Sequence, residues 1–578
     1  MDYLSIYNAW LRDDRLIGEL KEELLSIKDK NEDILYRFGA SLKFGTAGMR
    51  GFIGAGTNMM NVYTVKRATK GLSDYVIGLG KAAINRGVVI SYDTRRKSKE
   101  FAYAAAGVLV KNGIKTYVYA NARPVPMLSY AVRKLNCVAG IMITASHNPK
   151  EYNGYKVYGE DGAQMSPEAT SVVVSFINKI EDYLSVEGVD FSITAEKPDF
   201  EKYGVTLLNH DFEESYYQEL LKLGLSPEAV KAEGENIKLV YTPVHGTGYE
   251  PVTTVLKAMG INATVVEEQT KPDTEFSTVE VPNPEYKETL SMGIALADKI
   301  KADVVFGTDP DCDRLGVALR NPKGDFVALS GNQVGVLMLN YVLTRLKEEG
   351  KLRSDSFAVK SFVSTGLAKS VADGFGVEIK ETPVGFKFIG EKIKQAEESG
   401  VGDYVFGFEE SCGYLRGTHA RDKDAVVASM LFAELVCYYA YKKVSVFDVL
   451  EGIYQRFGYC VDKTISIGFT GLNAMDEMNA AVDKMREKTV EFIGDEKVLA
   501  VRDYLCGERK VDGKVEKLEY SDLNCLYYEL SRGGFVCLRP SGTEPKLKIY
   551  YSVSAKTLDL ANEKFNQVSA CFEKIFKS

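Results

Sequence analysis

The chain has 578 residues, of which 45% are hydrophobic and 26% are charged, with a net charge of −8 and nine scattered cysteines. This length predicts several domains of ordinary globular composition. The negative charge argues against a nucleic-acid surface, no apolar run approaches the ~20 residues of a membrane span, and the N-terminus lacks the pattern of a secretion signal. Because there is no CxxC pair, neither a disulfide framework nor a zinc site is expected. We predict a cytoplasmic protein with no nucleic-acid, membrane or obligate protein partner.

The first third of the chain predicts an α/β fold. Leucine and isoleucine recur at helical spacing within the first 40 residues, and a glycine-rich loop, FGTAGMRG, follows at 44–51. Strand-like and helix-like stretches then alternate, which is typical of α/β units built around a mainly parallel sheet. In chain order we expect a strand within 87–95, a helix over 99–112, a strand over 115–120, a helix over 126–135 and a strand from 141.

The same pattern restarts twice and then changes. Apolar strands within 236–248 and 302–314 bracket a second α/β unit, and strands within 356–365 and 402–414 bracket a third. Each strand runs into a polar, glycine-containing loop, and open α/β sheets bind ligands at that edge. After about residue 460 the pattern predicts an α+β domain whose sheet is mostly antiparallel.

Residues 141–156, IMITASHNPKEYNGYK, form the most informative segment. A buried strand ends at Thr144, and the following loop presents the hydroxyl of Ser146 beside the imidazole of His147, with Lys156 ten residues later. Neighbouring cations can hold the anionic oxygens of a phosphoryl group on such a serine. An ordinary strand-to-loop turn uses the same residue types, so this segment by itself leaves both interpretations open.

A second loop brings three carboxylates together. Asp309, Asp311 and Asp313 alternate in the sequence TDPDCDR after a predicted buried strand. Three carboxylates in a tight loop can converge on one hard divalent cation and leave positions open for phosphate oxygen, although a solvated acidic turn is the simpler alternative. Arg314 would balance the remaining negative charge or reach a phosphate. An aspartyl-phosphate hydrolase can also use an Asp-x-Asp loop, with its first Asp as the nucleophile.

Further loops carry groups suited to a sugar phosphate. GFEESCGY (407–414) offers acids and a hydroxyl for sugar hydroxyls, although exposed loop charges have the same composition. RDKD (421–424) adds charge that would orient this loop or the ligand. RPSGTEPK (539–546) combines an arginine, two hydroxyls and a glycine, which suits a phosphate cradle and also a hairpin turn. Cys312 and Cys412, inside two of these loops, are expected to be small fillers.

TASHNPKEYNGYK resembles the phosphoserine signature of the α-D-phosphohexomutases, the phosphoglucomutase and phosphomannomutase superfamily. FGTAGMRG, YDTR, DPDCDR, GFEESCGY and RPSGTEPK resemble further motifs in the family's order, so the resemblance covers roughly residues 40–555. It implies an α/β protein with a four-domain architecture, in which three related α/β mixed-sheet domains and a C-terminal α+β domain surround a central cleft. The implied domains are 1–205 with the phosphoserine loop, 206–322 with the metal loop, 323–458 with the sugar-binding loop and 459–578 with the phosphate-binding loop.

The resemblance also implies a role for individual residues. The implied catalytic residues are Ser146, Lys156, Arg50 and His147. The implied magnesium ligands are Asp309, Asp311, Asp313 and, through its phosphate, Ser146. The residues expected to bind substrate are Arg314, Lys387, Glu409, Ser411, Arg421, Lys423, Arg539, Ser541, Gly542 and Thr543. For YDTR at 92–95 a structural Asp–Arg pair is expected instead.

The activity implied by the resemblance is reversible interconversion of glucose 1-phosphate and glucose 6-phosphate, with Mg²⁺ as cofactor and glucose 1,6-bisphosphate as intermediate and activator. Phosphomannomutase and phosphopentomutase stay alternatives, because related sugars share the phosphate handling. A magnesium-dependent sugar-phosphate phosphatase would have no use for RPSGTEPK, and a non-catalytic sugar-phosphate-binding protein would not need the serine and three aspartates. Where some members have a His, this chain has Gly413, which leaves one contact unassigned.

Overall fold

The structure is a computed structural model that describes residues 2–45, 48–191, 199–471, 473–542 and 545–576. Its contacts divide the chain into two compact units. The first unit comprises Met1–Ala328, Gly390–Glu398 and Gly413–Tyr438. The second unit comprises Leu329–Ile389, Ser399–Cys412 and Tyr439–Ser578.

Three helices form the N-terminal segment of the first unit: α1 (Tyr3–Arg12), α2 (Gly18–Ser26) and α3 (Asn31–Phe38). The indole of Trp10 makes edge-on contacts with Phe38 and Tyr63, and these rings belong to one buried cluster. The helical spacing predicted helix here, and the structure divides it into three short helices joined by turns.

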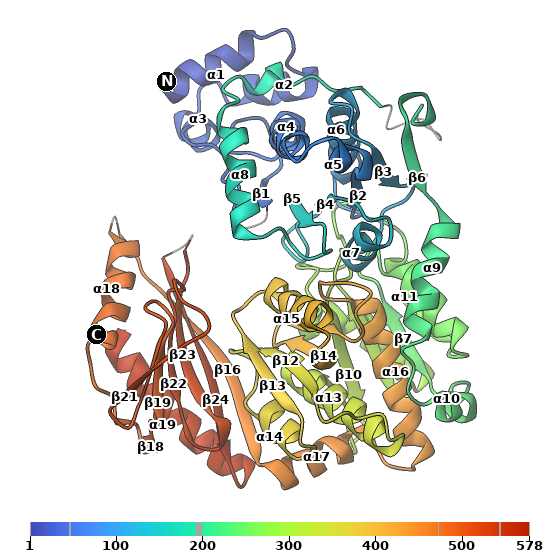
Figure 1. Ribbon diagram of the computed structural model, residues 1–578, viewed down its shortest axis with the longest axis vertical. Coiled ribbons are helices and arrows are strands. Elements are labelled where there is room, and N and C mark those ends of the chain that lie inside the picture. Colours follow the sequence, from blue (N-terminus) through green and yellow to red (C-terminus); the bar gives the residue numbers. More distant parts are fainter. Residues whose placement is uncertain (1, 46–47, 192–198, 472, 543–544, 577–578) are drawn as a thin grey trace. The chain divides into compact units, whose positions relative to one another are not determined.

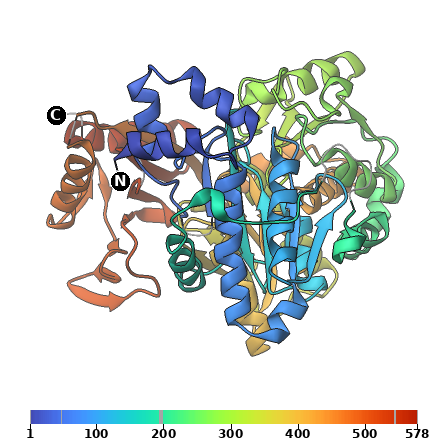
Figure 2. The same cartoon turned by 90° about the horizontal axis from the view of Figure 1, so that it is seen from above.

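The first sheet is mixed and has the strand order β1-β5-β4-β2-β3-β6 (Figures 1 and 2). β2, β3, β4 and β6 are parallel, while β5 lies antiparallel to β4 and β1. Helices α4 and α6 pack on one face and α7 on the other, so the central strands are buried on both faces and read as apolar runs. The elements are β1 (Gly48–Phe52), α4 (Val62–Gly78), α5 (Lys81–Arg86), β2 (Val88–Tyr92), α6 (Ser98–Lys111), β3 (Thr116–Tyr119), α7 (Val125–Lys134), β4 (Ala139–Ile143), β5 (Tyr152–Gly159), α8 (Pro167–Asn178) and β6 (Val205–Leu208).

The second sheet has the order β11-β10-β9-β7-β8, with β7 parallel to β8 and β9 and with β10 antiparallel to β9. Its buried core includes Val240 of β7, Val305 of β9 and Ala297 of α12. The elements are α9 (His210–Leu221), α10 (Pro227–Glu233), β7 (Leu239–Thr242), α11 (Tyr249–Ala258), β8 (Ala263–Val265), α12 (Ser291–Ile300), β9 (Val304–Thr308), β10 (Leu315–Arg320) and β11 (Phe326–Leu329).

In the third sheet, β12 lies between β13 and β14 and is parallel to both. The apolar strands predicted within 356–365 and 402–414 correspond to β12 and β14. Between residues 331 and 457 the elements are α13 (Gly331–Glu348), β12 (Ser356–Ser361), α14 (Leu367–Asp373), β13 (Glu378–Thr382), α15 (Phe386–Ser399), β14 (Asp403–Glu409), β15 (Gly413–Leu415), α16 (Ala425–Tyr441) and α17 (Val446–Phe457).

The fourth sheet is antiparallel throughout, with the order β16-β24-β23-β22-β19-β20-β21, as predicted for the last part of the chain. Apolar residues of α18 and α19 share its buried core. Strands β19 to β21 were not expected, because charged residues dominate their sequence. The elements are β16 (Tyr459–Gly468), α18 (Ala474–Arg486), β17 (Phe492–Ile493), β18 (Glu496–Lys497), β19 (Ala500–Asp503), β20 (Glu508–Val511), β21 (Lys514–Lys517), β22 (Leu526–Glu529), β23 (Phe535–Pro540), β24 (Lys546–Ala555) and α19 (Leu558–Phe576).

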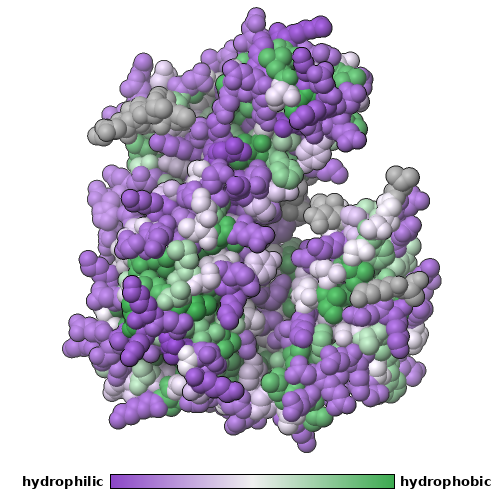
Figure 3. Space-filling model, turned by 180° about the vertical axis from the view of Figure 1, so that it is seen from behind, coloured by the Kyte–Doolittle hydropathy of each residue, from purple (hydrophilic) through white to green (hydrophobic). Residues whose placement is uncertain are grey.

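The face seen in Figure 3 is mainly hydrophilic, with apolar residues gathered in scattered patches. Among the described residues, no single helix is both long and apolar enough to cross a membrane. By length and composition, one bent pair of helices, Ala425–Tyr441 and Val446–Phe457, meets that test together.

Candidate active site

The hydroxyl of Ser146 lies in the turn that follows β4. Ser146 is 6% exposed and has a left-handed φ of 52°, a conformation that is uncommon outside glycine and often found at functional sites. Its backbone N–H donates to Thr144 Oγ1 at 2.8 Å. Its hydroxyl donates to Asp309 Oδ2 at 2.8 Å and lies 3.1 Å from His147 Nδ1. The predicted phosphoserine and the predicted metal loop are therefore in direct contact within the first unit.

Arg95 fixes the backbone of this turn by hydrogen bonds. Its guanidinium donates to the carbonyls of Ser146 and Asn148, and also to that of Pro149 at 2.9 Å. The side chains of Arg95 and Asp93 are fully buried and form an ion pair at 3.3 Å, which matches the expected structural pair in YDTR. The sequence did not indicate that this pair fixes the serine turn, because its partners are backbone carbonyls.

Three buried aspartates follow β9. Asp309, Asp311 and Asp313 are at most 2% exposed, and one carboxylate oxygen of each lies within 4.8 Å of the other two. Burial and the two neighbouring carboxylates raise the pKa of Asp309 well above its usual value. Among the described residues, Asp311 Oδ1 and Asp313 Oδ1 are buried without a hydrogen-bond partner. Buried carboxylate oxygens without partners suit a hard divalent cation such as Mg²⁺, so the donor set fits the predicted metal.

Two lysines from distant parts of the chain compensate this negative charge. Lys156 of β5 places its Nζ 3.0 Å from Asp311 Oδ2, and Lys423 places its Nζ 3.1 Å from Asp313 Oδ2. Burial raises the pKa of Asp311, but Lys156 and Lys423 outweigh burial and lower this pKa overall. Lys423, expected to bind substrate, thus lies at the metal loop.

Three further predicted residues surround the serine turn. Arg50 of β1 donates to Asn148 Oδ1 at 2.6 Å, because β1 pairs with β5 beside the turn. Arg314 pairs with Glu285 and lies 3.7 Å from Asp313. Burial and the nearby guanidinium groups lower the pKa of His147 to about 2, so its imidazole is neutral at physiological pH.

Arg421 is placed differently from the expected substrate contact. Its side chain is fully buried, pairs with Glu397 of α15 and donates to the carbonyl of Thr418 at 2.8 Å. A guanidinium that is fully buried among protein groups has no surface for a ligand. This placement supports the other role that the sequence allowed, which is to orient the loop.

In the second unit, the predicted sugar-binding loop contacts the predicted phosphate-contacting loop. Glu409 is 5% exposed, and its Oε1 accepts a hydrogen bond from the backbone N–H of Gly385 at 2.7 Å. Lys387, two residues later, lies in the first turn of α15. Ser411 follows β14 in the same loop as Glu409. Glu409 therefore fixes the backbone two residues before Lys387.

The RPSGTEPK segment borders a cavity of about 420 Å³ in the second unit. Arg539 is the penultimate residue of strand β23, and the Ser541 backbone N–H donates to the carbonyl of Lys546 at 2.9 Å. Arg539, Ser541 and Gly542 line this cavity. Thr543, also expected to bind phosphate, lies outside the described residues.

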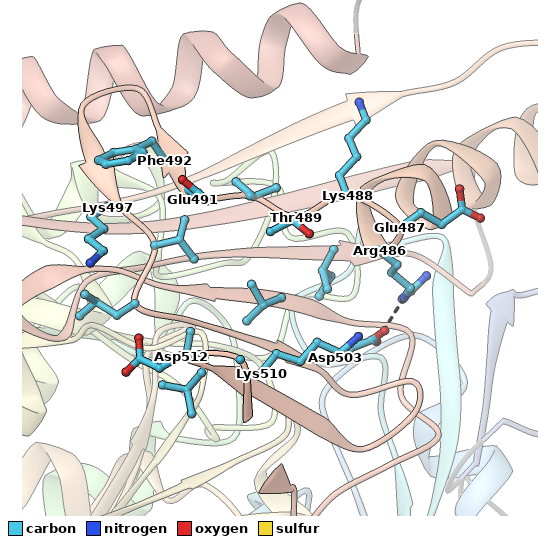
Figure 4. A pocket seen from close by; sticks show the side chains of 18 residues that line it. Arg486, Glu487, Lys488, Thr489, Glu491, Phe492, Lys497, Asp503, Lys510 and Asp512 are labelled. Atoms are coloured by element: carbon cyan, nitrogen blue, oxygen red, sulfur yellow. Dashed lines mark hydrogen bonds and ion pairs between the residues drawn. The ribbon is translucent and has the colours of Figure 1, made fainter. Parts of the chain in front are cut away.

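A second cavity of the second unit, about 640 Å³, is lined by other residues (Figure 4). Its wall includes the ion pair of Arg486 with Asp503, together with Lys488, Lys497 and Lys510. Among the described residues that line it, none was singled out from the sequence as a site residue.

The two loop cysteines are buried as small fillers. Cys312 and Cys412 are at most 2% exposed, and burial raises the pKa of Cys312 well above that of a free thiol. Both have a left-handed φ, of 50° and 61°, at positions that follow β9 and β14 as Ser146 follows β4. Each of the three α/β segments therefore has a residue with a left-handed φ shortly after the end of a strand.

Comparisons with known proteins place this chain in a family. Residues 41–184, 214–324 and 330–457 match the models of phosphoglucomutase/phosphomannomutase alpha/beta/alpha domains I, II and III. The chain belongs to the phosphoglucomutase/phosphomannomutase family, the α-D-phosphohexomutases. The fold class predicted from the sequence is confirmed, while the proposed domain boundaries stay predictions.

Individual relatives cover nearly the whole chain. A protein named phosphoglucomutase from Staphylococcus saprophyticus is 36% identical over 531 residues, which are 91% of this chain and 93% of the relative. A phosphoglucomutase from Staphylococcus aureus is 36% identical over 559 residues, 96% of each chain. The solved structure of parafusin, a phosphoglucomutase from Paramecium, shares the fold with a TM-score of 0.68 at 18% identity, covering 93% of this chain and 96% of that one.

Proposed function

We propose that this protein is a phosphoglucomutase, an isomerase that interconverts glucose 1-phosphate and glucose 6-phosphate. The observation that carries the proposal is the hydrogen bond of Ser146 to Asp309 at the edge of three buried aspartates. A nucleophilic hydroxyl beside a cation site is the arrangement that phosphoryl transfer requires. The names of the relatives at 36% identity support glucose phosphates over other sugars.

In this proposal Ser146 carries the phosphoryl group in the resting enzyme. The bond from phosphorus to Ser146 Oγ breaks as a bond to the free hydroxyl of the bound monophosphate forms, and the proton of that hydroxyl passes to a neighbouring base. The glucose 1,6-bisphosphate then turns round and returns its other phosphate to Ser146. Mg²⁺, held by Asp309, Asp311 and Asp313, would neutralise charge that develops during transfer.

The remaining residues bind, orient or stabilise charge. Lys156 and Arg50 are proposed to stabilise the transferred phosphoryl oxygens or to assist proton transfer. His147, whose Nδ1 lies 3.1 Å from the Ser146 hydroxyl, is a further candidate for a contact to the phosphoryl group. Arg539 and Ser541 are proposed to bind the phosphate that is not transferred, because a guanidinium and a hydroxyl are strong partners for phosphate oxygen. A cytoplasmic location accompanies this metabolic role as a prediction.

The test is an assay of the purified protein with glucose 1-phosphate, Mg²⁺ and catalytic glucose 1,6-bisphosphate, with formation of glucose 6-phosphate as the readout. Mannose 1-phosphate, ribose 1-phosphate and N-acetylglucosamine 1-phosphate are run in parallel. Preferred turnover of one of these would replace glucose as the substrate. Release of inorganic phosphate at a rate comparable to isomerisation would favour the phosphatase, and no turnover of any sugar phosphate would contradict the proposal.

A further inference from the structure

A chain of charged side chains joins the third sheet to the fourth sheet inside the second unit. Lys360 of β12 is 1% exposed and places its Nζ 2.8 Å from Glu381 Oε1. The other oxygen of Glu381 accepts a hydrogen bond from Arg502 of β19 at 2.6 Å. Glu381 therefore uses both carboxylate oxygens to connect a strand of the third sheet to a strand of the fourth.

On the fourth sheet, Arg502 also contacts residues of the strand next to the one that carries Arg539. Arg502 pairs with Glu529 of β22 and lies over the ring of Tyr527 at 4.9 Å. Strand β22 pairs directly with β23, whose end holds Arg539. Arg502 thus connects Glu381 to the strand that pairs with β23, and β23 carries the predicted phosphate arginine.

Apolar contacts exclude water beside this ionic chain. Phe362, just after β12, stacks on Tyr504 with ring centroids 4.5 Å apart and an interplanar angle of 17°. The two rings share a buried cluster with Tyr527 and Tyr550. A charge-assisted hydrogen bond is stronger in such partly buried surroundings than at an open surface.

Glu381 stays ionised in this setting. Burial raises the pKa of its carboxyl group, but Lys360 and Arg502 outweigh burial and lower that pKa to about 2. The contact between the two sheets is consequently charged at every pH at which the protein would act.

The ionic chain lies beside two predicted substrate loops. Glu381 lies four residues before Gly385, whose N–H is held by Glu409. The cavity of about 420 Å³ is lined on one side by Phe362, Val384 and Phe388, and on the other by Arg539 and the residues that follow it. Because residues of both loops line this cavity, its shape depends on their spacing.

We propose that Glu381 and Arg502 are positioning residues that hold the phosphate-binding loop of Arg539 against the Gly385–Lys387 loop before substrate binds. The role rests on the proposed function, because it concerns the site that receives the phosphate not being transferred. A binding site that is assembled in advance has a higher apparent affinity, since affinity falls with the fraction of molecules in the competent arrangement.

The test is Arg502→Gln, which leaves each carboxylate a second cation: Lys360 for Glu381 and Arg509 for Glu529. We expect the KM for glucose 1-phosphate to rise about fivefold or more, because a smaller fraction of molecules holds the competent arrangement, while kcat changes less than about twofold. Arg502→Lys should recover part of the loss. The matched control is Arg509→Gln, which also removes a partner of Glu529; among the described residues, Arg509 forms its ion pairs with Glu516 and Glu529, both on the fourth sheet.

Hydrogen–deuterium exchange gives a readout that does not depend on activity. Exchange at residues 383–388 and 538–542 should quicken in Arg502→Gln and stay at the wild-type rate in Arg509→Gln. The combined variant Glu381→Gln/Arg502→Gln should lose less than the sum of the two single changes, because both changes remove the same Glu381–Arg502 contact.

The outcomes separate this proposal from the proposed function. Unchanged KM together with unchanged exchange in Arg502→Gln would overturn the positioning role, and so would an equal effect of Arg509→Gln. If the wild-type protein isomerises no sugar phosphate, the proposed function is wrong. Faster exchange in Arg502→Gln than in the wild type and Arg509→Gln would still support the positioning role.

Discussion

In the first unit, Ser146, Lys156 and Lys423 each lie within about 3 Å of an aspartate of the metal loop, and all three aspartates are buried. In the second unit, Arg539, Ser541 and Gly542 instead border a cavity of about 420 Å³. In the first region, the charges of the aspartates are compensated by contacts within the protein. The second region leaves space for a ligand, and the contact between Glu381 and Arg502 positions its loops.

This difference follows from what each region has to do. Groups that stabilise charge during phosphoryl transfer act best when they are preorganised and shielded from water. Groups that recognise a substrate must stay accessible to it, so their orientation has to come from contacts on the opposite side. The following variants test that contrast, because changes in the first region should lower kcat and changes in the second should raise KM.

The largest expected effect belongs to Ser146→Ala. Removing the hydroxyl should lower kcat by about 10⁴-fold or more, as for loss of a covalent nucleophile. Intact-mass measurement should find a phosphate on the wild-type protein that this variant lacks, with similar thermal unfolding of both. Ser175→Ala, an exposed serine of α8, is the control and should behave as wild type. Near-normal turnover by Ser146→Ala would contradict the mechanism.

Asp311→Asn should produce the next largest loss, about 100-fold or more in kcat, because a carboxylate ligand of the cation is removed. Chelation by EDTA should silence the wild-type protein, and added Mg²⁺ should restore it. Mg²⁺ should also raise the melting temperature of the wild type more than that of the variant, because it relieves repulsion between the carboxylates. The control is Asp303→Asn, at an exposed position just before β9, which should keep the wild-type kcat and the wild-type rise in melting temperature with Mg²⁺. Full activity in metal-free buffer would refute the metal site.

Arg95→Lys keeps the charge beside Asp93 but loses the planar group that spans several carbonyls of the serine turn. We expect kcat to fall by about 10- to 100-fold, as for a small displacement of a reacting group, with little change in KM. Steady-state kinetics and the phosphate content of Ser146 measure this effect. If kcat is unchanged, the turn holds its conformation without Arg95.

The smallest expected effect is on binding. Arg539→Ala should raise the KM for glucose 1-phosphate by about tenfold or more, because a charge-assisted hydrogen bond is worth roughly 1.5–3 kcal/mol, and should leave phosphate at Ser146. Arg532→Ala, an exposed arginine in the turn before β23, is the control. A KM equal to that of the wild type would mean that RPSGTEPK is only a turn.

Local features of the sequence were sufficient for the fold class and for the chemistry of single loops. Apolar strands that run into polar loops predicted three α/β segments, because a strand buried on both faces needs an unbroken apolar run. DPDCDR predicted a metal loop, because three carboxylates in a tight loop can converge on one divalent cation. The charged strands β19 to β21 were missed, because their pairing depends on neighbouring strands more than on apolar pattern.

Contacts between distant residues were decided only by the tertiary structure. Ser146 meets Asp309 across 163 positions of sequence, and Lys423 reaches Asp313 from a third segment. Arg95 holds backbone carbonyls, and Glu381 meets Arg502 across 121 positions, without a motif that marks either contact. A sequence pattern reports the periodicity and chemistry of neighbouring residues. Which buried charge faces which partner depends on how the sheets bring their loops together, because only that arrangement sets the distances over which charges act.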